Sequence, residues 1–232
     1  TAFTAGNISA RLTSFFNAAN ALAADPSGIA QRTDFLDQAD AVASAIRDTA
    51  GRLRGIADNI VTAATTAADQ LNSLSASLAQ VNTGLRKAQP GTNAAAALAD
   101  ERDRLLDQMA SLTAISVKEN ADGSVDVRLN HPTGPTLVTG DKAVKVAVSG
   151  ASGNLVMTLD PYGDPRPVAM TGGALAGLAD AASRIQDARQ TLAKVDGVLA
   201  QAQALGKNAS EATTDLAGLR AEVEANLRKV EG

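Results

Sequence analysis

The feature that most strongly limits what this chain can fold into is a long heptad repeat whose two apolar positions carry no charge. Between residues 34 and 88, apolar residues recur every seven positions in two series, four positions apart. No charge falls on either series, and no proline occurs between Ser27 and Gln89. This pattern is typical of the two core positions of a coiled coil. A helix of this length would be roughly 80 Å long at 1.5 Å per residue. The two series are Ile46, Leu53, Ile60, Ala67, Leu74 and Val81, and Ala50, Ala57, Ala64, Leu71, Leu78 and Leu85.

Helical spacing of apolar residues continues on both sides of this repeat. The run from Asp25 to Gly28 contains Pro26 and ends a first helix, and Gln89-Pro90-Gly91 ends the long one. After Gly172-Gly173 a second heptad series begins, and a break near Gly206 separates it from a last helix. Helices are therefore predicted at about residues 7–24, 34–88, 94–112, 174–205 and 209–230.

From Thr113 onward the spacing of apolar residues alternates, as in β-strands. Asp122-Gly123 between two alternating runs is a strong hairpin signal. The proline-rich run at 160–167 is not expected to form a regular element. Short strands are predicted at 115–117, 125–129, 136–138, 143–148 and 154–158.

These patterns predict a mainly α (α+β) fold with a small β-rich insert. Residues 1–113 together with 171–232 would form a long-helix bundle with the shape of an elongated rod, and residues 114–170 would form the insert. We expect the heptad seams to form the core of this bundle, with lateral association to another chain as the alternative. No residue is assigned to a subunit interface. The predicted core-seam residues are Ile46, Leu53, Ile60, Leu71, Leu74, Leu78, Val81, Leu85, Leu178, Ile185, Leu192 and Leu199.

The composition argues against several classes of function. The chain lacks cysteine, which excludes disulfides, a thiol nucleophile and thiolate metal sites. Its formal charge of −4 argues against nucleic-acid binding, which normally needs a basic patch. No apolar run approaches the roughly 20 residues of a membrane span. Only 2% of the residues are aromatic, which argues against a deep ligand pocket.

Four local motifs are better explained by a structural role than by catalysis or ligand binding. His131, the only histidine, precedes a proline and is interpreted as an exposed loop residue. The charged run at 100–107 has the spacing of a salt-bridged outer helix face. Gly172-Gly173 lacks the lysine of a phosphate loop, and residues 120–126 lack the ligand spacing of a calcium loop. We predict no catalytic, cofactor-binding or metal-binding residue, no cofactor and no enzymatic activity.

Several short stretches carry a further signal because they occur in a particular order. They are Phe15-Phe16-Asn17-Ala18, residues 22–27, Leu98-Ala99-Asp100-Glu101-Arg102-Asp103-Arg104-Leu105-Leu106-Asp107-Gln108, residues 115–117, Asp122-Gly123-Ser124-Val125-Asp126-Val127, residues 172–178 and Lys229-Val230-Glu231-Gly232. In this order the chain resembles the flagellar hook-associated protein 1 family, the hook–filament junction proteins. The resemblance spans nearly the whole sequence.

The resemblance implies a structural axial subunit of the bacterial flagellum, located outside the cell after export without a cleaved signal peptide. Such subunits polymerise through terminal helices, and this chain would be a core that lacks both. An outer β-rich domain common in the family would also be absent. The implied partners are the chain itself, the hook protein, the second hook-associated junction protein and, through the missing terminal region, an export chaperone. Nucleic acid and membrane insertion are not expected.

Two other functions stay open on the sequence alone. One is another flagellar axial protein, either the second junction protein or a flagellin-like subunit. The other is a helical sensor or binding module of a bacterial receptor.

Overall fold

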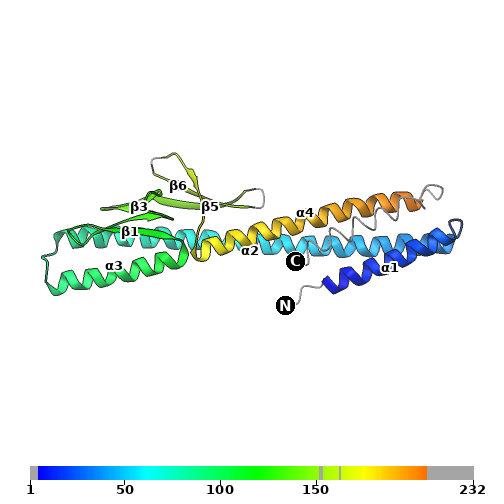
Figure 1. Cartoon of the computed structure of the whole chain (residues 1–232), viewed down its shortest axis with the longest axis horizontal. Helices are drawn as coiled ribbons and strands as arrows, with labels where there is room; N and C mark the ends of the chain where they lie inside the picture. Colours follow the sequence, from blue (N-terminus) through cyan, green and yellow to red (C-terminus); the bar gives the residue numbers. More distant parts are fainter. Residues whose placement is uncertain (1–4, 152–153, 162, 208–232) are drawn as a thin grey trace. The chain divides into compact units, whose positions relative to one another are not determined.

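The structure, a computed structural model, describes residues 5–151, 154–161 and 163–207. Within them the chain forms four α-helices and seven β-strands (Figure 1). The predicted mainly α fold with a small β-rich segment is confirmed. The predicted helix at 209–230 lies outside the described residues. The elements are α1 (Ala5–Ala24), α2 (Ile29–Lys87), α3 (Asn93–Leu112), β1 (Ile115–Glu119), β2 (Val125–Leu129), β3 (Thr136–Thr139), β4 (Lys142–Ala143), β5 (Lys145–Ala151), β6 (Asn154–Asp160), β7 (Arg166–Val168) and α4 (Gly173–Lys207).

Helix α2 begins earlier than the sequence predicted. The turn after α1 is closed by the amide of Gly28, which donates to the carbonyl of Asp25 at 3.1 Å. The amide of Arg32 then donates to the Gly28 carbonyl, also at 3.1 Å. The helical hydrogen-bond pattern therefore starts directly after the turn, and α2 begins at Ile29 rather than at residue 34.

The strands form two antiparallel sheets, with the orders β1-β2-β3-β4 and β5-β6-β7. The turn between β1 and β2 lies at the predicted Asp122-Gly123 pair. The amide of Gly123 donates to the carbonyl of Asn120 at 2.9 Å, and Gly123 has a φ of 77°. Glycine suits this position because a positive φ is costly for most other residues.

Strand β7 corrects the expectation that residues 160–167 contain no regular element. Pro167 lies within β7 and pairs with Thr158 of β6. The strand is at the edge of its sheet and has a neighbour on one side only. A proline is tolerated there because its missing amide hydrogen is not needed by a second neighbouring strand.

The chain packs as two compact units, residues 1–56 with 185–232 and residues 57–184. Both α2 and α4 contribute to each unit, so the division falls within helices. The predicted boundary between a bundle (1–113 with 171–232) and an insert (114–170) is different from this division. We retain it as a proposal about how the fold is organised.

The first unit has a helical core in which aromatic rings meet. Phe15 of α1 packs against Phe35 of α2 with ring centroids 5.2 Å apart. Both rings are buried, as are Leu22 of α1 and Leu199 of α4. Three helices thus share one core, and the aromatic residues within the described part of the chain belong to it.

The second unit places the sheets on the helices. In Figure 1 the strands gather on one side of α2 and α3. Alternate residues of β2 and β6 are buried, as expected for strands with one face on a core. They pack with α2, α3 and the first part of α4 in one apolar cluster. The buried residues of these two strands are Val125, Val127, Leu129, Leu155, Met157 and Leu159.

The first and last residues of the β-rich segment lie next to each other in the second unit, where α3 ends and α4 begins. The amide of Ala114 donates to the carbonyl of Thr171 at 2.7 Å. Gly173, the first residue of α4, has a φ of 64°, and a Cβ atom there would lie 2.5 Å from the carbonyl carbon of Leu112. The end of α3 and the start of α4 are therefore in backbone contact, which only glycine permits at this position.

Candidate functional site

The predicted seam residues divide between the cores of the two units. Eight of them are buried and four are half-buried. One continuous stripe on α2 therefore supplies two different cores along its length. In the first unit these residues are Ile46, Leu53, Leu192, Leu199 and the half-buried Ile185; in the second they are Leu71, Leu78, Val81, Leu85 and the half-buried Ile60, Leu74 and Leu178.

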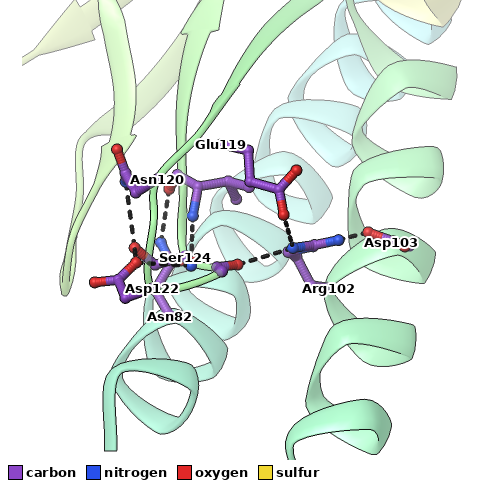
Figure 2. Close-up of polar contacts among 9 residues, drawn as sticks. Asn82, Arg102, Asp103, Glu119, Asn120, Asp122 and Ser124 are labelled. Carbon is purple, nitrogen blue, oxygen red and sulfur yellow. Dashed lines mark hydrogen bonds and ion pairs between the residues drawn. The ribbon is translucent and has the colours of Figure 1, made fainter. Parts of the chain in front are cut away.

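Asn82 of α2 joins the helix to the four-stranded sheet through three hydrogen bonds. Figure 2 shows its side chain next to the β1–β2 hairpin. Its side-chain oxygen accepts from the amide of Val125 at 2.9 Å, and its Nδ2 donates to the Val125 carbonyl at 2.8 Å. Nδ2 also donates to the carbonyl of Gly140 at 3.0 Å. The fully buried amide thus takes the place of a neighbouring strand where β2 extends past β3.

Asn72 makes the same kind of contact with the other sheet. Its Nδ2 donates to the carbonyl of Val146 and its side-chain oxygen accepts from the Val146 amide, both at 2.8 Å. Val146 belongs to β5, an edge strand whose other neighbour is β6. Asn72 therefore satisfies backbone groups of the edge that would otherwise be open to another strand.

Arg102 of α3 connects this helix to the hairpin between β1 and β2. Its Nη1 donates to the carbonyl of Gly123 at 2.8 Å and to Oε1 of Glu119 at 3.1 Å, while its Nε donates to Asp103 at 2.8 Å (Figure 2). The hydrogen bond to Asp103 is the main reason why the pKa of the Arg102 guanidinium is raised. Arg102 is largely buried, whereas the carboxylates of Asp103 and Glu119 are exposed. Exposed ion pairs add little stability, so the main role of Arg102 is to hold the hairpin in place on α3.

Asp122 stabilises the hairpin turn itself. Its Oδ1 accepts from the hydroxyl of Ser124 at 2.6 Å and from the Ser124 amide at 3.0 Å. These two hydrogen bonds lower the pKa of the Asp122 carboxyl below its ordinary value. The turn is held by contacts that depend on the charge of one exposed side chain.

Acidification is expected to weaken this turn. Because the folded-state pKa of Asp122 is lowered, its contribution to stability is present above the ordinary pKa and is lost as the pH falls through the folded value. Between about pH 5 and about pH 3, the free energy of unfolding should fall less for Asp122→Asn than for the unchanged chain. Urea titrations at each pH measure this difference. Asp141→Asn, at an exposed carboxylate between β3 and β4, is the matched control and should follow the unchanged chain.

The asparagine contacts were missed by sequence reasoning, although a signal was present. Asn82 lies one turn after Leu78, on the face of α2 that carries the predicted core. A polar residue at such a position needs a partner, because a buried amide without hydrogen bonds is costly. The sequence could show that need but not which strand meets it.

Of the motifs interpreted as structural, His131 and most of the charged run of α3 lie on the surface, whereas Arg102 is largely buried and Ser124 is buried in the hairpin. His131 is exposed, and its Nδ1 is 2.9 Å from the hydroxyl of Thr133. In the charged run of α3, Arg104 pairs with Glu101, which lowers the pKa of the Glu101 carboxyl. Over residues 5–151, 154–161 and 163–207, no group of three or more acidic, histidine or cysteine side chains is placed to hold a metal ion. No helix in this part of the chain is long and apolar enough to cross a membrane.

Two comparisons with known proteins agree on the fold. The family model described as the flagellar hook-associated protein FlgK helical domain matches residues 2–204. Among solved structures, the chain is similar to the flagellar hook junction protein FlgK from Burkholderia pseudomallei, with a TM-score of 0.67 and 22% sequence identity. That match covers 82% of this chain and 35% of the solved one, so this chain spans about a third of that protein. No curated protein matches the sequence.

The family match covers α1 to α3, all seven strands and most of α4. It therefore includes both asparagine contacts and the Arg102 network. The chain belongs to the FlgK family of flagellar hook-associated proteins and carries the helical domain of that family.

Proposed function

We propose that this chain is part of a structural axial subunit of the bacterial flagellum, at the junction between hook and filament. The observation that carries the proposal is the match to the FlgK helical domain over residues 2–204. The similarity to a solved hook junction protein supports the same fold. The side chains of Asn72, Asn82 and Arg102 bind backbone groups of the strands and the hairpin and so hold the sheets on the helices, which is compatible with a structural role.

The partners follow from this role. The subunit would assemble with further copies of itself, contact the hook protein on one side and the second hook-associated junction protein on the other, and be handled by an export chaperone. It would act outside the cell after export through the flagellar pathway. We assign it no catalytic step, and a panel of hydrolase substrates is expected to give no signal.

Immunogold electron microscopy tests the location. Antibodies raised against the 232-residue chain should label intact flagella at one narrow zone between hook and filament. Antibodies against the hook protein mark the hook on the same grids and provide the control. Label spread along the filament would instead indicate a flagellin-like subunit, and label on the cell membrane a receptor module; either result would contradict the proposal.

The purified chain should be monomeric at micromolar concentration and largely helical. The match covers only 35% of the solved hook junction protein, so polymerisation in this proposal needs parts of a full-length subunit beyond the helical domain, which alone should not form ordered tubes. Sedimentation velocity and circular dichroism measure both properties. Stable ordered tubes formed by this chain alone would show that assembly does not depend on those parts.

A further inference from the structure

Three arginines line a groove in the unit formed by residues 1–56 and 185–232. Arg47 and Arg54 come from α2, and Arg189 comes from α4. The groove has a volume of about 350 Å³, and the buried side chains of Ile46 and Leu192 reach its floor. It is therefore a basic cleft with an apolar base, large enough to take several side chains.

The positive charge of this groove is not neutralised within residues 5–151, 154–161 and 163–207. Over the described residues, none of Arg47, Arg54 and Arg189 forms an ion pair. Asp196 is the single carboxylate among the lining residues, so the groove keeps an excess of two positive charges. An anionic partner that brings some apolar surface would complement it.

The same chain carries an acidic surface with a matching repeat. Asp100, Asp103 and Asp107 lie at positions i, i+3 and i+7 of α3, on the side opposite the buried Leu105 and Met109. Asp100 and Asp107 form no ion pair within the part of the chain that the structure describes. They are seven residues apart, as are Arg47 and Arg54, and seven helical residues span about 10.5 Å in each case.

We infer that the acidic face of α3 in one copy docks in the arginine groove of a second copy. This inference rests on the proposed function, because it names a surface through which axial subunits would meet. The two surfaces differ, so the contact is heterologous: a docked pair still offers one free groove and one free acidic face. Addition can therefore continue from copy to copy, unlike a closed symmetric dimer.

The docking would be weak for the chain alone. Exposed charge pairs are each worth little, and their attraction is screened by salt. Association is expected at concentrations well above micromolar and at low ionic strength, which is compatible with a monomer in dilute solution. In a polymer held together by other segments, even a weak contact fixes how neighbouring copies are oriented.

Cross-linking between copies tests the contact directly, because the natural chain has no cysteine. Ala193 lines the groove, and Ala110 lies on α3 just beyond Asp107; both are exposed. When Ala193→Cys and Ala110→Cys chains are mixed at low salt and treated with a short bis-maleimide, the mixed dimer should exceed either same-variant dimer severalfold. Ala76→Cys, at an exposed position on α2, replaces Ala110→Cys in the control mixture.

Charge reversal then identifies the pairs. Arg47→Glu with Arg54→Glu in the groove chain, or Asp100→Lys with Asp107→Lys in the α3 chain, should each lower the mixed dimer about tenfold, whereas the two reversed chains together should restore it. Arg52→Glu, on another face of α2, is the matched control and should change the yield little. About 0.5 M NaCl should suppress the reaction in every pairing.

Several outcomes would overturn the inference. One is a mixed-dimer yield no higher than with Ala76→Cys, and another is equal loss in the single and double reversals. A third is that polyglutamate protects the thiol of the Ala193→Cys chain while no cross-link forms between copies, which would indicate a different acidic partner. None of these results moves the immunogold label, so failure of the docking surface is distinguishable from failure of the junction assignment.

Discussion

Replacing Asn82 with leucine is expected to lower the free energy of unfolding by about 3–5 kcal/mol. The change leaves the amide and carbonyl of Val125 and the carbonyl of Gly140 without their side-chain partner. A buried polar group that loses its partner costs roughly 1–3 kcal/mol, and leucine cannot replace either the donor or the acceptor. Urea unfolding followed by circular dichroism measures the loss, and hydrogen exchange at the Val125 amide should become faster.

Two further variants separate the causes of this effect. Asn59→Leu makes the same substitution at an exposed position of α2 and should change stability little. Asn82→Asp keeps an oxygen for the Val125 amide but cannot donate to either carbonyl, so it should also be strongly destabilising. Equal stability of the Asn82→Leu and Asn59→Leu chains would show that the buried amide does not hold the sheet on the helix.

Leu78→Asp is expected to unfold the unit formed by residues 57–184. Leu78 is fully buried in the core between α2, α3 and the sheets. Ionised aspartate at this site would have no partner, and burying it would cost on the order of 5 kcal/mol. A small unit has a stability of similar size, so cooperative melting of this part should disappear. Thermal circular dichroism and proteolysis within the β-rich segment would report the change.

Neighbouring positions on α2 should show graded effects. Leu74 is half-buried and lines a surface groove with Gln70 and Gln108, so the aspartate of Leu74→Asp can reach water and its effect should be smaller. Ala76→Asp, on the exposed side of the helix, should have little effect. An equal response at positions 74 and 78 would contradict the burial that distinguishes them.

Local patterns in the sequence predicted much of the fold. The heptad repeat was sufficient to predict one long helix, because helical periodicity depends only on the spacing of residues that are close together in the sequence. Asp122-Gly123 likewise predicted a hairpin, since the turn depends on a few adjacent side chains. The strand at Arg166–Val168 was not predicted because Pro167 suits only an edge position, and the position of a strand in a sheet depends on distant residues.

The candidate site was harder to predict for the same reason. The contact between Asn82 and Val125 joins residues 43 positions apart in the chain, and that between Asn72 and Val146 joins residues 74 apart. Nothing in the heptad repeat indicates that its core partners change along α2, from α1 and the later part of α4 to the sheets, α3 and the first part of α4. The sequence identifies residues that need partners, whereas the fold decides which partners they find.

The backbone contact where α3 ends and α4 begins has a consequence for how the domain can vary. Because Ala114 and Thr171 are hydrogen-bonded and Gly173 rests on Leu112, the two ends of the intervening segment are already together. Closing a loop between ends that meet costs little more for a long loop than for a short one. Loops within this segment can therefore differ in length at little cost, provided that the strands keep the buried residues that pack on α2 and α3.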